Sequence, residues 1–185
     1  MTTVQSYLTS IMSDQEFRAV FTLLWQTWAW HDSFEKAFVD FKKKIPEYVR
    51  LGTDSHRFVI WEGEQIVAHA SLFAREVHTE HGSIRLGALS AVCTHMDYRK
   101  QGFGAQVVRA AFELVDNGTF PVSLWMTTVP GFYKKLGARI IQNSWVNSQN
   151  TDDPSADPWP DEQKMVYPAR YAWPSGQIDL NGAAY

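Results

Sequence analysis

The segment Val92-Cys-Thr-His-Met-Asp-Tyr-Arg-Lys-Gln-Gly-Phe-Gly-Ala105 decides the fold, because it joins an apolar stretch to a helix-like one through a glycine-rich loop. Gly102 and Gly104 permit open backbone conformations and the close approach of a ligand. The N–H groups of the loop and of the first helical turn point to one spot, where the helix dipole favours negative charge. Arg99 and Lys100 add positive charge. The segment predicts a cradle for a pyrophosphate, and a glycine-rich turn without a ligand is the alternative.

Two other phosphate-binding patterns do not fit this loop. The pattern Gly-x-Gly-x-x-Gly would need glycine at the position of Val107, and the Gly-Lys-Ser/Thr ending of a P-loop does not occur in the sequence. The loop therefore disfavours a dinucleotide-binding fold of the doubly wound type.

The composition narrows the class of protein. The chain has 185 residues, of which 45% are hydrophobic and 20% charged, and its formal net charge is −3. This size suits one domain with a substantial core, and the mild acidity argues against broad nucleic-acid binding. No apolar run approaches the ~20 residues of a membrane span, and residues 1–13 lack the layout of a secretion signal. With Cys93 as its single cysteine, the chain is expected to be soluble and cytoplasmic.

Hydrophobic periodicity around the loop predicts a mixed α+β domain with about seven strands and about four helices. Ser13-Asp-Gln-Glu16 is a capping-box pattern that opens the first helix. The apolar face of this helix consists of Phe17, Val20, Phe21, Leu24 and Trp28. The expected helices cover residues 14–28, 33–43, the stretch from the glycine pair to Asn117, and 131–136, and the expected strands cover 2–9, 56–62, 65–77, 83–94, 121–128, 138–145 and 165–171.

Two ordered motifs resemble the GNAT superfamily of N-acetyltransferases. Tyr98-Arg-Lys-Gln-Gly-Phe-Gly104 matches the Arg/Gln-x-x-Gly-x-Gly/Ala motif that binds acyl-CoA, and Phe132-Tyr-Lys-Lys-Leu-Gly137 resembles the second motif. The resemblance implies the GNAT fold, with a mixed central sheet splayed between the fourth and fifth strands. It further implies a single domain over 1–185, with a CoA-binding core at about 56–145, acceptor-side helices at about 14–45 and a C-terminal loop and strand at about 147–185.

The resemblance also assigns roles to the residues that match its motifs. Acetyl-CoA is the implied co-substrate, with no metal. Its pantetheine arm would add beside the strand end like an extra strand. Tyr133 would protonate the departing thiolate, and packing of a half-buried tyrosine under CoA is the alternative. The implied CoA-binding residues are Val92, Cys93 and Thr94 for the pantetheine, and Arg99, Lys100, Gln101, Gly102, Phe103, Gly104 and Ala105 for the pyrophosphate.

The general base stays open at the sequence level. Many relatives carry a glutamate on the strand before the loop, whereas residues 86–92 contain no carboxylate. A water held by Ser90, a histidine or aspartate from another element, or an amine that arrives neutral are the alternatives. The candidate histidines are His69, His78 and His95, each also readable as structural or exposed. Cys93 has no visible base beside it and is disfavoured as a nucleophile, and the histidines lack metal-ligand spacing.

Two weaker resemblances concern the acceptor. The tail Trp173-Pro-Ser-Gly-Gln-Ile-Asp-Leu-Asn-Gly182 is similar to the end of the nodulation N-acyltransferases, and the glycine loop is similar to that of the aminoglycoside 2′-N-acetyltransferases. Both families act on amino sugars. Trp30, Asp32 and Ser90 are the expected acceptor-binding residues, since aromatic walls stack on sugars or hold ammonium groups.

The acidic stretch after residue 150 is either a rim that attracts a cationic amine or a solvated loop. Its acidic residues are Asp152, Asp153, Asp157, Asp161 and Glu162. The expected partner is a small-molecule amine, with a homodimer left open and no nucleic acid or membrane. Two other functions stay open: an acyltransferase that uses longer acyl-CoA or an acyl carrier protein, and a non-catalytic acyl-CoA-binding regulatory module.

Overall fold

The computed structural model divides into two compact units, which are described separately. The first unit comprises residues 1–73 and 89–113, and the second comprises 74–88 and 114–185. Two long strands, β3 (Gln65–Thr79) and β4 (Gly82–Thr94), contribute residues to both units. The structure describes residues 3–28, 33–46, 52, 54–159 and 162–185.

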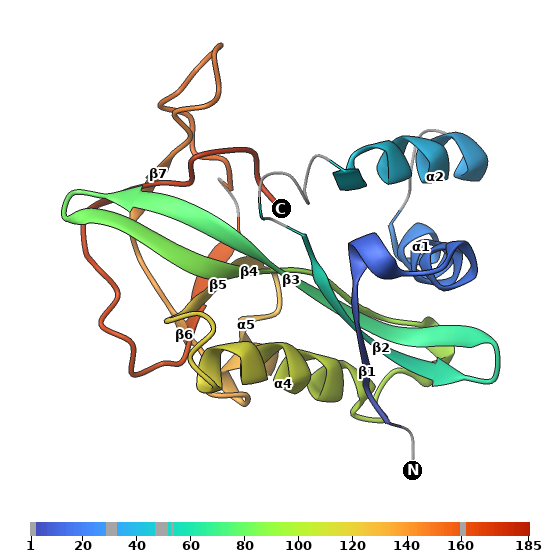
Figure 1. Ribbon diagram of the computed structural model, residues 1–185. Helices are drawn as coiled ribbons and strands as arrows, with labels where there is room; N and C mark the ends of the chain where they lie inside the picture. Colours follow the sequence, from blue (N-terminus) through green and yellow to red (C-terminus); the bar gives the residue numbers. More distant parts are fainter. Residues whose placement is uncertain (1–2, 29–32, 47–51, 53, 160–161) are drawn as a thin grey trace. The chain divides into compact units, whose positions relative to one another are not determined.

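The first unit contains a run of neighbouring strands in the order β1-β2-β3-β4. β1 (Gln5–Leu8) pairs antiparallel with β2 (His56–Glu62), which pairs antiparallel with β3. In Figure 1, β3 and β4 form a long hairpin drawn in green. Residues 66–70 of β3 are all buried, so this strand supplies core on both of its faces. β1 is shorter than the predicted strand over residues 2–9.

The helices of the first unit begin where the sequence predicts. In α1 (Asp14–Thr27) the capping box is present: the Ser13 N–H donates to Glu16 Oε2 at 2.8 Å, and the Glu16 N–H donates to Ser13 Oγ at 3.3 Å. Ser13 therefore fixes the start of the helix. α2 (Phe34–Lys43) has a simpler cap, in which Ser33 Oγ accepts from the Lys36 N–H at 3.4 Å.

Aromatic side chains fill the space between α1 and α2. The Phe21 ring lies 5.3 Å from Phe34 and 5.6 Å from Phe38, both edge to face, and Phe17 stacks on Phe41 at 5.6 Å. Such edge-to-face and offset contacts add to the stabilisation from buried area. α1 and α2 are thus held together by an aromatic cluster.

The predicted core role of Trp28 is wrong. The other four members of the predicted apolar face are buried, whereas Trp28 is 42% exposed. The helix ends at Thr27, and Trp28 has an extended backbone with φ −118° and ψ 133°. Helical periodicity no longer sets the direction of its side chain.

α4 (Phe103–Asp116) follows the glycine loop directly. Its residues Val107, Val108 and Ala111 are completely buried, as the repeated apolar spacing predicts. The helix ends where the Gly118 N–H donates to Val115 O at 3.0 Å with a positive φ of 84° at Gly118. No helix among the described residues is long and apolar enough to cross a membrane.

The second unit joins its strands in the order β4-β5-β8-β6. β5 (Ser123–Thr127) lies parallel to β4, and the ladder consists of the pairs Gly87–Ser123 and Ala88–Leu124, although both strands continue beyond it. This short parallel ladder is the splay expected between the fourth and fifth strands. The remaining elements are α5 (Pro130–Lys134), β6 (Arg139–Ile140), β7 (Ser144–Val146), β8 (Gln163–Tyr167) and β9 (Gln177–Asp179).

The strand predicted over residues 138–145 is divided in two. β6 pairs with β8, whereas β7 pairs with β9, so the chain changes partner between them. Asn143 lies at this change and donates to Pro174 O at 3.1 Å and to Gly176 O at 2.9 Å. β9 was not predicted, because three residues beside Gly176 give no strand pattern.

Candidate active site

The glycine loop connects β4 to α4 within the first unit. The His95 N–H donates to Val67 O at 2.8 Å, and a turn of 3-10 helix, η2 (Met96–Tyr98), follows. Arg99 Nε donates to Thr94 O at 3.3 Å, which ties the loop to the strand end. Lys100 and Gly102 have positive φ angles of 65° and 84°, so the chain reverses sharply before the helix. For Lys100 this conformation costs about 1 kcal/mol.

The first turn of α4 presents unused N–H groups. The Gln106 N–H donates to Gly102 O at 3.1 Å and is the first donor of the helical ladder, so the N–H groups of residues 103–105 precede it. Residues 99–102 are exposed, and a Cβ on Gly102 would meet open space. Free amide donors, a helix dipole and two basic side chains together suit an anionic diphosphate.

Aromatic contacts brace the loop. The Tyr98 ring lies 5.8 Å from His95 and 6.4 Å from Phe103, across the turn from strand to helix. These contacts link the two ends of the loop.

The end of β4 departs from a regular strand at Ala91, whose φ is +51°. Ser90, Ala91 and Val92 are all partly exposed, whereas Cys93 is buried among apolar residues of α1, β2 and β3. Burial raises the pKa of the Cys93 thiol to about 12, so the thiolate is scarce at neutral pH. This agrees with the sequence argument against a nucleophilic cysteine.

Tyr133 belongs to the second unit, on the short helix α5. The Val129 N–H donates to Thr127 Oγ1 at 3.0 Å before the helix begins. The Tyr133 ring lies 5.0 Å from Trp125 and 4.8 Å from Phe132, and the residue is 5% exposed. Burial raises the pKa of Tyr133 above its usual value, which keeps the phenol protonated. A tyrosine with its ordinary pKa is also protonated at neutral pH, so the role of Tyr133 as a proton donor stays a prediction.

His69 is unsuited to the role of general base. It is completely buried, and burial followed by the charge of Arg57 lowers its pKa to about 3. Its Nε2 lies 3.1 Å from Arg57 Nη1 and its Nδ1 lies 2.7 Å from Ala91 O. Both ring nitrogens are therefore occupied within the protein.

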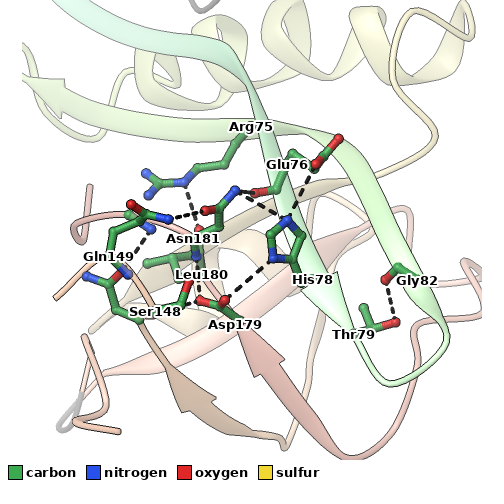
Figure 2. A network of polar contacts seen from close by, with 12 residues as sticks. Arg75, Glu76, His78, Thr79, Gly82, Ser148, Gln149, Asp179, Leu180 and Asn181 are labelled. Atoms are coloured by element: carbon green, nitrogen blue, oxygen red, sulfur yellow. Dashed lines mark hydrogen bonds and ion pairs between the residues drawn. The ribbon is translucent and has the colours of Figure 1, made fainter. Parts of the chain in front are cut away.

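His78 lies in a polar network of the second unit, shown in Figure 2. Its Nδ1 is 3.5 Å from Asp179 Oδ2, and its Nε2 is 3.4 Å from Glu76 Oε1 and 3.4 Å from Asn181 Nδ2. Asp179 also accepts from the N–H groups of Ser148 at 3.0 Å and Asn181 at 2.8 Å. This network fastens β9 to β3, so His78 has a structural role.

Two of the remaining acceptor-side and base candidates lie near the loop. His95 caps η2, with Nδ1 accepting from the Asp97 N–H at 3.4 Å. Ser90 is partly exposed on β4, and its carbonyl accepts from Ser71 Oγ at 3.2 Å. Trp30 and Asp32 lie outside the described residues.

The acidic stretch is partly structural. Asp157 pairs with Lys164 Nζ at 3.1 Å and accepts from the Trp159 N–H at 2.7 Å. Asp152 and Asp153 are exposed, and hydrogen bonds from Ser155 lower the pKa of Asp153. A cationic acceptor would therefore meet fewer free carboxylates than the sequence suggests.

Sequence reasoning missed an open pocket of about 530 Å³ in the second unit. Gln142, Ser144, Glu162 and Gln163 give it polar walls, and Trp145 adds an aromatic one. Its lining comes from three separate segments, 140–145, 162–164 and Gly176, so no local pattern could have revealed it. Among the described residues, no group of three or more metal-ligating side chains could hold a metal ion.

The profile of the acetyltransferase (GNAT) domain family matches residues 10–141. The match covers more than half of the 185 residues, and the chain belongs to this family. No curated protein sequence matches the chain.

Solved structures share the fold at low sequence identity. The YhbS acetyltransferase of Escherichia coli, solved in complex with CoA, has a TM-score of 0.62 and 12% identity over 99% of this chain and 94% of its own. Glucosamine-6-phosphate N-acetyltransferase of Arabidopsis thaliana has a TM-score of 0.58 and 19% identity over 76% of this chain and 94% of its own.

Some similar structures belong to longer proteins. The GCN5-related N-acetyltransferase of Kribbella flavida has a TM-score of 0.60 and 16% identity over 75% of this chain, and 33% of that protein is covered. The same share, 33%, of a probable N-acyltransferase from Enterococcus faecalis is covered. The chain thus spans about a third of these two proteins.

Proposed function

We propose that this protein transfers an acetyl group from acetyl-CoA to a primary amine. One observation carries the proposal: in a chain of the GNAT family, the exposed basic loop 99–102 leads into the first turn of α4, whose amide donors at residues 103–105 precede the helical ladder. Such a loop suits the negative charge of the CoA pyrophosphate.

The same loop and the strand before it would hold the donor. The amides of residues 99–105, with the side chains of Arg99, Lys100 and Gln101, bind the pyrophosphate. Val92, Cys93 and Thr94 bind the pantetheine through their backbone at the end of β4, where the chain leaves regular strand geometry at Ala91. The bound thioester supplies an activated acyl group.

The reaction joins the amine nitrogen to the acyl carbon and breaks the carbon–sulfur bond. The amine loses a proton, and the leaving sulfur gains one. Tyr133 is the proposed donor of that second proton, because its phenol is protonated at neutral pH and can give the proton up as negative charge develops on the sulfur. Direct transfer needs no enzyme nucleophile, in line with the raised pKa of the Cys93 thiol.

The first proton leaves the amine without His69, which is buried and engaged on both nitrogens. An amine that arrives neutral, or a water chain at the exposed face of β4 near Ser90, fits the described residues better. His95 is the histidine beside the loop, and its Nδ1 is already an acceptor within η2.

Amino sugars are the proposed acceptor class. The C-terminal and loop resemblances to acyltransferases of amino sugars support it, as does the fold likeness to an enzyme that acetylates glucosamine 6-phosphate. Because the tail resembles that of the nodulation N-acyltransferases, longer acyl groups, carried by CoA or by an acyl carrier protein, should also be tested as donors.

A non-catalytic acyl-CoA-binding module is the second candidate. It is favoured by β4 itself, because Leu86, Ala88 and Leu89 are buried apolar residues and no carboxylate stands on this strand before the loop. Such a module would bind the donor and release no thiol.

Calorimetric titration tests donor binding first. CoA and acetyl-CoA should bind with micromolar dissociation constants, and 3′-dephospho-CoA should also bind because the pyrophosphate is retained. If neither CoA nor acetyl-CoA gives heat of binding at high micromolar concentration, both proposals, the acetyltransferase and the acyl-CoA-binding module, are refuted.

A further inference from the structure

A buried network of hydrogen bonds crosses the first unit from Thr9, the residue that follows β1, to β4. Arg57 Nε donates to Thr9 Oγ1 at 2.7 Å, and Arg57 Nη1 lies 3.1 Å from His69 Nε2. His69 Nδ1 then lies 2.7 Å from Ala91 O. Arg57 is 4% exposed and His69 is 0% exposed, so water does not compete for these bonds.

The partners define the protonation state of His69. A guanidinium has donors and no acceptor, so His69 Nε2 must accept from Arg57. The remaining proton is on Nδ1, which donates to the Ala91 carbonyl. His69 is therefore a neutral donor, a state that agrees with its lowered pKa.

The carbonyl that receives this proton belongs to the irregular residue of β4. Ala91 has a φ of +51°, which an alanine adopts rarely and only when its surroundings hold it there. The conformation of Ala91 sets the direction of the next peptide groups, those of Val92 and Cys93. These are the groups proposed to contact the pantetheine.

We propose that His69 is a positioning residue for the acyl donor: by holding the Ala91 carbonyl, it fixes the left-handed conformation that directs the Val92 and Cys93 peptides toward the thioester. The inference rests on the proposed acyltransferase function. It gives this buried Arg–His pair a role in orienting the donor, distinct from the pyrophosphate contacts of the glycine loop.

Two substitutions at position 69 separate the two hydrogen bonds. In His69→Asn the side-chain amide nitrogen stands at the place of Nδ1 and can still donate to Ala91 O, while the bond to Arg57 is lost. In His69→Gln the longer side chain can accept from Arg57, while the donor to Ala91 O is lost. We expect His69→Asn to keep kcat within threefold of wild type and His69→Gln to lower kcat at least tenfold.

The dissociation constant for CoA should stay within threefold of wild type in both variants, because the glycine loop is untouched. A role limited to filling space or solvating Arg57 predicts the opposite order, since glutamine is nearer to histidine in size. Equal kcat in the two variants, or a lower kcat in His69→Asn, would overturn the inference. Ser71→Ala is the matched control: it removes a side-chain hydrogen bond to the neighbouring Ser90 carbonyl at 3.2 Å and should leave kcat within threefold.

A second pair of variants tests the same inference if no substitution at position 69 is tolerated. These variants change residue 91 and keep the side chains of Arg57 and His69. Valine resists positive φ and glycine accepts it. Ala91→Val should therefore lower kcat at least tenfold, with the CoA dissociation constant within threefold, and Ala91→Gly should keep kcat within threefold. Equal kcat in these two variants would contradict the role of the Ala91 conformation.

Amide hydrogen exchange separates failure of this inference from failure of the proposed function. Residues 91–94 should exchange at least tenfold faster in His69→Gln than in wild type and at the wild-type rate in His69→Asn. This readout needs no donor. Absence of acyl transfer in the wild-type protein would refute the proposed function, and unchanged exchange in His69→Gln would refute the control of Ala91 by His69.

Discussion

Tyr133 is a single residue whose proposed role depends on one hydroxyl. The Tyr133→Phe variant keeps the ring that packs 5.0 Å from Trp125 and removes the phenol. We expect kcat to fall about 100-fold, in the range of a lost general acid, while the CoA dissociation constant stays within about twofold. Thiol release in the steady state gives kcat, and calorimetry gives the affinity. Wild-type turnover in this variant would exclude Tyr133 as the acid.

His69 makes stability depend on pH. Its pKa falls from 6.5 in the unfolded chain to about 3 in the folded one, through burial first and the Arg57 charge second. Below pH 6.5 His69 is protonated in the unfolded chain but stays neutral in the folded one. The contribution of His69 to the stability of the folded state, present above pH 6.5, is therefore lost as the pH falls toward 3.

We expect this residue alone to lower the free energy of unfolding by up to ~1.4 kcal/mol per pH unit inside that window. Urea unfolding of wild type and His69→Asn at pH 7, 5.5 and 4 measures it, since the difference between the two proteins isolates residue 69. A difference that is constant with pH would show that His69 does not titrate as described.

At the scale of single residues, the sequence predicts the residues of the glycine loop but not the buried contacts of His69. The glycines and basic residues of 99–104 are contiguous, so their chemistry is legible in one short segment. The contact of His69 with Arg57 and Ala91 joins three strands, and its burial depends on how they pack. A single histidine in an apolar stretch of sequence does not indicate contacts with Arg57 or Ala91.

Among the elements, the turn from β4 into α4 carries the proposed donor site. Gly104 lies in the first turn of α4 and is partly exposed. Gly104→Trp should fill the pyrophosphate cradle and weaken CoA binding at least ~100-fold, or about 2.7 kcal/mol.

Glu113→Trp is the control, because it places the same side chain on an exposed position of the same helix. Calorimetry with CoA should give wild-type affinity for the control. Equal affinities in the two variants would mean that the cradle lies elsewhere.

The elements with strong local signals were predicted well. The capping box of α1, the Ser33 cap of α2 and the apolar stripe of α4 define helices from sequence alone. The sequence predicts one strand where the structure has β6 and β7, and it predicts no strand at β9. The pairing of these short strands depends on tertiary contacts, such as those of Asn143 with the C-terminal segment. Trp28 shows the same limit at a helix end.

At the scale of the whole molecule, family membership and site chemistry converge. The family profile spans residues 10–141, which include α1, α2, the glycine loop and Tyr133. The motifs at 98–104 and 132–137 predicted this family from the sequence, because their order and spacing reflect the succession of strand, loop and helix. The prediction of a single domain over 1–185 stays a prediction beside the two compact units.

The central claim is amine-dependent acyl transfer, and release of free CoA thiol from acetyl-CoA tests it most directly. The wild-type protein should release thiol only when an amine is present, in equal amount to N-acetylated product, with amino sugars among the active amines. Thiol release no faster than in the absence of protein, for acetyl-CoA and longer acyl donors with every amine of the panel, would contradict the account.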